Sequence, residues 1–347
     1  MRQDENAPGT RARHAVGAVA VTCLLANPLA AETATARAVG AANAFLSALD
    51  EKQRAKVLFA FDDEKQRARW SNLPTAMVPR GGLAMGELSA AQRSAALAAL
   101  SSVLSPRGFE KVQQIVEADE VLKFSEGNNR LFGRDLYYIS ILGTPSETDP
   151  WMLQFGGHHL GLNVTIAGAQ GVLTPSMIGA QPALYTANGK TVRPLGEESD
   201  KALALLNALD EGQRKQAILG YRVADLVLGP GQDGKRIQPE GLKGSAMNER
   251  QRALLVELVS EWATIVHESA AAARMKELAA GIGETWFAWS GPTAATPGRN
   301  TTAYYRIQGP SLVIEYAPQP LGGDPSLHIH TMYRDPTNDY GRKLAPR

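Results

Sequence analysis

The sequence predicts an α+β fold built from two repeated halves, each a helix pair followed by antiparallel β-hairpins. Two observations support this prediction. Helix-start motifs recur at a constant spacing, and aromatic or β-branched runs that end in glycine or proline follow each helix pair. We expect a signal peptide at residues 1–31, a first half at 32–195 and a second half at 196–347, with the halves packed as one globular unit.

The composition is that of a folded protein with no strong charge bias. The 347 residues are 44% hydrophobic and 20% charged, and the formal net charge is +1. Because no basic field is available to hold a phosphate backbone, nucleic acid is excluded as an expected partner. After the N-terminus no apolar run approaches the roughly 20 residues of a membrane-spanning helix, so no span is expected once the signal is removed.

The first 31 residues have the layout of a secretory signal. Arg2, Arg11 and Arg13 precede an apolar stretch at 15–25, and small residues follow at 29–31. An ordinary buried first helix is the alternative interpretation. Cleavage near residue 31 would place the mature protein in the periplasm or outside the cell. It would also remove the single cysteine, so that no disulfide forms.

Four short segments predict helix starts of one kind. Each has Asp, Ser or Asn as the capping residue and Gln-Arg three and four positions later. This is the capping-box pattern, in which two side chains satisfy the free amide groups of the first turn. The segments are residues 49–54, 88–93, 209–214 and 247–252.

The spacing of these motifs predicts a tandem duplication. Gln53 and Gln213 are 160 residues apart, and Gln92 and Gln251 are 159 apart. Two nearly equal offsets are more consistent with an internal repeat than with unrelated caps.

Strand-like runs follow each predicted helix pair. They are rich in aromatic and β-branched residues and are separated by glycine and proline, as in hairpins. In the first half they are residues 136–142, 151–155 and 160–166, and in the second half 286–289, 303–307 and 312–316. We expect the segment 168–194 to be mostly loop and to carry the chain across to the second half.

Two longer motifs suggest a family. Residues 154–160 read Gln-Phe-Gly-Gly-His-His-Leu, and residues 328–341 read His-Ile-His-Thr-Met-Tyr-Arg-Asp-Pro-Thr-Asn-Asp-Tyr-Gly. Both resemble the DUF3500 family of bacterial and fungal proteins, and the resemblance covers most of the chain after the signal. Because the family name records an unknown function, the resemblance implies no activity, and function has to be argued from the residues.

Four histidines are the candidate metal ligands. His328 and His330 repeat at period two, so both imidazoles leave the same face of a strand, about 7 Å apart. His158 and His159 stand in a predicted hairpin turn, where one of the two can face inward. We expect both pairs to converge on one divalent ion, namely zinc, copper or iron. A capped turn and a solvent-facing edge strand are the structural alternatives.

The repeat provides an internal control for these histidines. Pro310 and Ser311 occupy the positions in the second half that match His158 and His159, and the first half has no His-x-His after residue 166. The fold therefore does not need histidine at these places, which favours a binding site. A shared site requires the two halves to pack face to face, with the ion at their seam.

Three further residues are candidates for catalytic work. Glu315 interrupts an apolar strand just before the His-x-His segment and is the best additional ligand, although a strand charge facing water is the alternative. Arg334 and Asp335 follow in a polar turn. A carboxylate here would orient an imidazole or act as a general base, and ordinary turn chemistry is the alternative.

These observations predict an exported, metal-dependent enzyme that acts on a small molecule or a peptide. Hydrolysis is favoured over oxidation because zinc chemistry needs no electron donor. A non-catalytic copper-binding or carrier protein is the main alternative. A binding module that uses Trp289, Tyr304 and Tyr305 is a third hypothesis.

Overall fold

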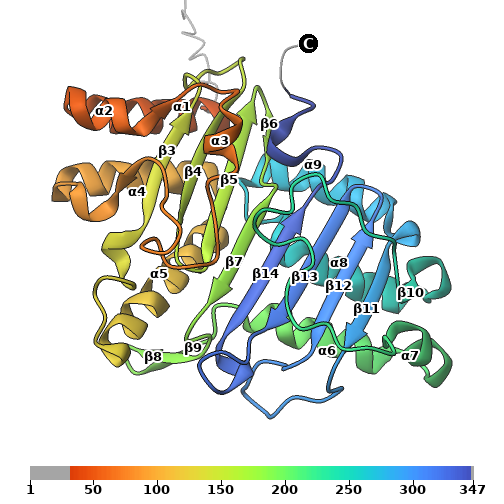
Figure 1. Cartoon of the computed structure of the whole chain (residues 1–347). Coiled ribbons are helices and arrows are strands. Elements are labelled where there is room, and N and C mark those ends of the chain that lie inside the picture. Colours follow the sequence, from red (N-terminus) through yellow and green to blue (C-terminus); the bar gives the residue numbers. More distant parts are fainter. Residues whose placement is uncertain (1–31, 345–347) are drawn as a thin grey trace, which may run out of the picture. The chain divides into compact units, whose positions relative to one another are not determined.

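The computed structural model describes residues 32–344. The described residues from Thr33 onward form one compact unit. The predicted signal peptide lies outside the described residues. This unit combines helices with one large mixed sheet, so the predicted α+β class is confirmed (Figure 1).

The helices of the two halves follow one another in matching order. Those of the first half are α1 (Ala34–Ser47), α2 (Glu51–Val57), α3 (Glu64–Arg67), α4 (Ala90–Val103) and α5 (Pro106–Glu126). Those of the second half are α6 (Gly196–Ala208), α7 (Glu211–Ala217), α8 (Glu249–Ala263) and α9 (Glu268–Ala280). All four predicted helix starts are confirmed as complete capping boxes, at α2, α4, α7 and α8. Among the described residues, no helix has both the length and the apolar character that crossing a bilayer requires.

The strands confirm the predicted hairpins to within about two residues at most ends. The first half contributes β1 (Leu58–Phe59), β2 (Leu83–Ala84), β3 (Tyr138–Leu142), β4 (Trp151–Gly157), β5 (Leu160–Ala167), β6 (Gln170–Val172) and β7 (Ser176–Ala180). A separate small hairpin consists of β8 (Tyr185–Ala187) and β9 (Lys190–Val192). The second half contributes β10 (Leu242–Lys243), β11 (Trp286–Ser290), β12 (Tyr304–Gly309), β13 (Leu312–Pro318) and β14 (Ile329–Arg334).

The large sheet joins the two halves through β7 and β14. Its order in the described chain is β1-β3-β4-β5-β7-β14-β13-β12-β11-β10, with β2 beside β3 and β6 beside β5. All neighbours are antiparallel except β1 and β3. The expected face-to-face packing of the halves is therefore wrong. They meet edge to edge, because backbone hydrogen bonds between β7 and β14 continue one sheet across the seam.

The expectation that 168–194 is mostly loop is also wrong. This segment contains β7, a central strand of the sheet. The strand has only five residues, includes a glycine, and lies between Pro175 and Pro182, so its local sequence resembles a loop. Pairing with β5 and β14 on either side makes it a strand.

The sheet has two different faces. On one face, alternate strand side chains pack with the helices in the main apolar core, whose largest members include the fully buried Trp151, Trp262 and Trp289. Figure 1 shows α6, α8 and α9 behind strands β11 to β14. The other face is covered by segment 60–82, which is irregular apart from α3, and by the irregular segment 218–241. Both segments hydrogen-bond to buried polar side chains of the strands. We call it the loop-covered face, and it carries the candidate site.

Candidate metal centre

His328 and His330 reach the loop-covered face from β14, one of the two strands that form the seam between the halves. His330 lies in β14, and its Cα partners are Gly179 of β7 and Ala317 of β13. His328 directly precedes β14. The two-residue spacing puts both imidazoles on one side of the strand, as predicted. The small side chains opposite His330 leave room beside its ring.

His159 comes to the same place from the turn between β4 and β5. Its φ of 59° lies in the left-handed region, which non-glycine residues rarely adopt. The backbone N–H of His159 donates to the Asn72 carbonyl at 3.2 Å, and its own carbonyl accepts from the Gly179 N–H at 2.7 Å. Contacts on both sides therefore hold the turn in this conformation and direct the imidazole to the seam.

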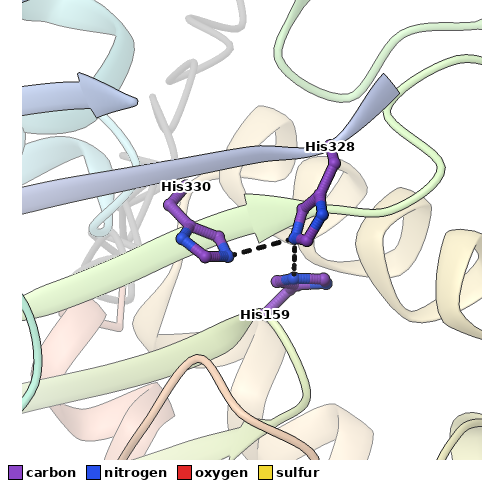
Figure 2. A group of neighbouring side chains, drawn as sticks. All are labelled: His159, His328 and His330. Carbon is purple, nitrogen blue, oxygen red and sulfur yellow. Dashed lines mark hydrogen bonds between the residues drawn. The ribbon is translucent and has the colours of Figure 1, made fainter. Parts of the chain in front are cut away.

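The three histidines form a compact group, which we call the triad (Figure 2). The Nε2 atom of His328 lies 2.9 Å from that of His159 and 3.2 Å from that of His330. One donor atom from each residue lies within 4.8 Å of the others. Nitrogen ligands about 2.1 Å from one ion are about 3.0 to 3.4 Å apart at angles between 90° and tetrahedral, so the two short separations suit a shared ion.

Hydrogen bonds at the far side of two rings fix which nitrogen faces the centre. His328 Nδ1 lies 2.7 Å from the Leu321 carbonyl, and His330 Nδ1 lies 3.3 Å from Oδ1 of Asp225. Both oxygens accept, so each Nδ1 carries the hydrogen and each Nε2 presents a lone pair when the ring is neutral. This arrangement, with Nδ1–H bound to an oxygen acceptor, is the usual one for metal-binding imidazoles.

The triad is buried, and burial disfavours protonation of two of its rings. The exposed fractions are 2% for His159, 6% for His328 and 5% for His330. Burial, and then the neighbouring imidazoles, lower the pKa of His159 well below its ordinary value. Burial lowers the pKa of His328 to about 4, although its hydrogen bond to Leu321 raises it. Both rings are neutral near pH 7, the form that binds metal.

Asp225 remains an anion beside the triad. Burial raises its pKa, but hydrogen bonds from His330, from the Leu226 N–H and from Gln319 outweigh that effect and lower it overall. The negative charge next to the Nδ1–H of His330 favours a cation bound at Nε2 of that ring.

His158 is placed differently from its neighbour. Its Nδ1 lies 2.7 Å from Oδ1 of Asp119, whose other oxygen accepts from the Gly133 N–H. The ring of His158 packs against that of His159, with centroids 3.7 Å apart. Of the four histidines proposed as ligands, the structure therefore brings three into one group, and the fourth supports it from the side.

Comparison with known families gives one result. Residues 31–342 match the family model described as a protein of unknown function (DUF3500). The chain belongs to the DUF3500 family. No curated protein and no solved structure matches it. Membership thus supplies no activity for this DUF3500 chain, and the triad has to be judged by its own geometry.

Glu315 is fully buried on the same face and holds the covering segment. Its carboxylate accepts from the N–H groups of Val227 and Leu228 at 2.8 and 2.7 Å and from the Tyr304 hydroxyl at 2.6 Å. It is not among the triad's close donor atoms. Its contacts fix segment 218–241, which carries Asp225.

Arg334 holds the same segment through several contacts. Its guanidinium donates to the carbonyls of Leu228 and Gly229 at 2.7 and 3.1 Å. It also pairs with Asp233 at 2.7 Å and Asp339 at 3.0 Å. The side chain thereby ties the segment to β14 and to the C-terminal turn.

Asp335 stabilises the turn after β14. It forms an ion pair with Arg274 at 3.2 Å and accepts from the N–H and hydroxyl of Thr337. These contacts match the turn chemistry that was the alternative interpretation.

Two carboxylates next to the site were missed by the sequence analysis. Asp119 had a usable signal, since it lies between Ile115 and Leu122 on the buried stripe of α5, where a carboxylate needs a partner. Asp225 had none, because it lies in an irregular segment without periodicity.

A cleft of about 530 Å³ lies near the triad. Its lining residues include Ala224, Pro318 and Pro320. Ala224 directly precedes Asp225, and Pro320 directly precedes Leu321. Pro318 is the Cα partner of Ile329, the residue between His328 and His330. Asp225 and Leu321 contact the Nδ1 atoms of the rings. The cleft thus adjoins residues that neighbour the triad's partners, and none of the three triad histidines lines it.

Proposed function

We propose that this protein binds one transition-metal ion through the Nε2 atoms of His159, His328 and His330. The observation that supports this most strongly is the 2.9 and 3.2 Å spacing of these nitrogens inside a buried group. His328 presents a lone pair to the centre, and His330 does so when its ring is neutral, because their Nδ1 atoms carry the hydrogens. Buried lone pairs that face one another repel unless a cation lies between them.

Zinc, copper and iron all accept imidazole ligands in such a group. Asp225 supports the site by holding the ring of His330 and by adding negative charge near the ion. The contacts of Glu315 with segment 218–241 support the site indirectly, because that segment positions Asp225.

The second candidate is a metal-dependent enzyme, with a hydrolase favoured over an oxidoreductase. Three protein ligands leave one coordination position for water or substrate, as in catalytic zinc sites. The hydrogen-bonded pair of His158 and Asp119 beside His159 resembles a general base and the group that orients it. No triad histidine lines the nearby cleft of about 530 Å³, which favours metal binding without catalysis instead.

We also propose that the protein is exported. The family match begins at residue 31, where the predicted signal ends. Mass spectrometry of protein made in its own host should find a mature N-terminus near residue 31 or 32. Cytoplasmic protein that retains residues 1–31 would refute export and leave the metal site unaffected.

The test of metal binding compares the wild type with a double variant. Chelator-treated wild-type protein should take up one zinc ion per chain in a calorimetric titration, whereas His328→Ala combined with His330→Ala should take up none. His267→Asn is the matched control, because it removes an imidazole while asparagine can still cap α9. A double variant that binds zinc as well as the wild type refutes the proposal.

The enzyme candidate has its own test. The zinc-loaded protein is assayed for hydrolysis of simple esters, phosphoesters and peptides. Activity in the wild type that the double variant lacks supports catalysis. Full metal occupancy without turnover supports a binding or carrier role.

A further inference from the structure

Two buried methionines lie beside the triad on the loop-covered face. Met177 of β7 and Met332 of β14 are Cα partners across the seam, and Met332 is two positions from His330 on the same strand. Both side chains are fully buried and pack with Trp70 in one small apolar cluster. Two thioether side chains therefore lie next to the triad on the same face of the sheet.

Met177 and His159 both border the space that the missing side chain of Gly179 leaves open. A Cβ at position 179 would lie 3.1 Å from the terminal methyl of Met177 and 3.4 Å from Cβ of His159. The end of the Met177 side chain thus extends along the strand from position 177 toward Gly179, where His159 also lies. Gly179 is also the Cα partner of His330, so a larger residue here would separate the thioether from the site.

Thioether sulfur is a soft donor that prefers copper(I) and contributes little to zinc binding. Methionine has three rotatable side-chain bonds, so its sulfur can adjust to an ion without movement of the backbone. We infer that Met177 is the fourth ligand of the triad site and that three imidazoles plus this thioether make the site selective for copper(I). This inference rests on the proposed metal site.

The fourth ligand also bears on function. A thioether in the remaining position leaves no place for an activated water, which catalytic zinc sites require. An N₃S site of this kind belongs to a copper-binding or carrier protein.

The experiment measures two affinities on the same proteins. Copper(I) affinity is determined without oxygen by competition with a chromophoric chelator, and zinc affinity by competition with a zinc chelator. Met177→Leu should weaken copper(I) binding by about tenfold or more while changing zinc binding less than about threefold, because leucine fills the space without a donor atom. Met152→Leu is the matched control, since Met152 is a fully buried methionine in another cluster, and it should change neither affinity.

Each outcome separates the fourth ligand from the site itself. Wild-type protein that binds neither metal refutes the proposed function. Unchanged copper(I) binding by Met177→Leu, or equal losses for both metals, refutes the thioether ligand and leaves the triad intact. If that variant fails to fold, X-ray absorption of selenomethionine-labelled wild-type protein loaded with copper(I) decides. Selenium scattering at the copper edge is expected, and nitrogen-only coordination overturns the inference.

Discussion

The two halves of the sheet are built on the same local contacts. In the first half, the side-chain amide of Gln53 donates to Gln92 at 3.3 Å, and in the second half Gln213 donates to Gln251 at 3.0 Å. A two-residue strand then pairs with the first hairpin strand in each half, β2 with β3 and β10 with β11. The order of helices and hairpins is the same once β1, α3, β6 and the small β8–β9 hairpin of the first half, which have no counterpart among the elements of the second, are set aside. Their origin in a duplication stays a prediction.

The halves differ in how they hold the segment that covers them. Gln154 and Asn163 are Cα partners on β4 and β5, and Arg306 and Glu315 are Cα partners on β12 and β13. The amide of Gln154 donates to Asn163 and to two carbonyls of segment 60–82. Arg306 and Glu315 instead bind segment 218–241 with a cation and an anion.

This difference shows what the scaffold requires and what the site adds. On the first half, the strand side chains that hold the covering segment are neutral amides, and Arg80 of that segment also donates to the Gly157 carbonyl at 3.0 Å. Charged strand side chains serve as anchors where the segment also carries Asp225, whose carboxylate lies close to His330. Charge-assisted hydrogen bonds are stronger and more directional than neutral ones, so they fix this segment more firmly.

The largest expected difference follows from these anchors. Glu315→Ala leaves the N–H groups of Val227 and Leu228 and the Tyr304 hydroxyl without their acceptor, and should lower the free energy of unfolding by about 3–5 kcal/mol. Asn163→Ala, the change at the matching position, should cost about 1–3 kcal/mol. Urea unfolding measures both. Equal losses would contradict a special role for the charged anchor.

A bound ion should stabilise the two halves together. Zinc at about 100 times its dissociation constant should add about 2.7 kcal/mol to the free energy of unfolding. Because the ligands come from both sides of the seam, hydrogen exchange should slow in β4 and in β12 alike, and in neither strand of His330→Ala. Slowing confined to one half would show that the site does not couple them.

The metal-free protein should lose stability as the pH falls. The folded-state pKa of His328 is about 4 against an ordinary value of 6.5, so the unfolded chain binds more protons between these limits. The free energy of unfolding should fall by about 1 kcal/mol per pH unit from pH 6.5 toward 4. In His328→Gln the slope should be smaller, and an unchanged slope would contradict the buried neutral imidazole.

The smallest expected effect is a similar loss of stability when the matching capping-box glutamines of the two halves are removed. Gln53→Ala and Gln213→Ala each remove one capping-box side chain and its link to the next helix, and each should cost about 1 kcal/mol. The two losses should agree within about 0.5 kcal/mol. A clear disagreement in thermal or urea unfolding would weaken the view that the two helix pairs are equivalent.

Local signals made much of the fold predictable. The four capping boxes depend on residues three positions apart, and the hairpins on alternation within a few residues. The missed helix α5 also had a local signal, since Ser105 caps it and Pro106 occupies its first position. Strand β7 and the joining of the halves had none, because they result from pairing between distant segments.

The site, like the fold, was predictable from local sequence signals and only as far as those signals reach. The period-two spacing of His328 and His330 determines that they share a face. Which residue of the His158–His159 pair faces the seam depends on a left-handed turn. Hydrogen bonds from this turn to β7 and to segment 60–82 hold it in that conformation. The Leu321 carbonyl and Asp225 come from irregular segments, whose positions only the tertiary structure shows.

The most direct test of a site shared between the halves is the zinc affinity of His159→Ala and His158→Ala measured side by side. His159 should behave as a ligand, so its loss should weaken binding by at least about 100-fold. His158 lies beside the triad and bonds to Asp119, so its loss should weaken binding by less than about tenfold. The reverse order, or equal effects, would contradict a centre formed by His159, His328 and His330.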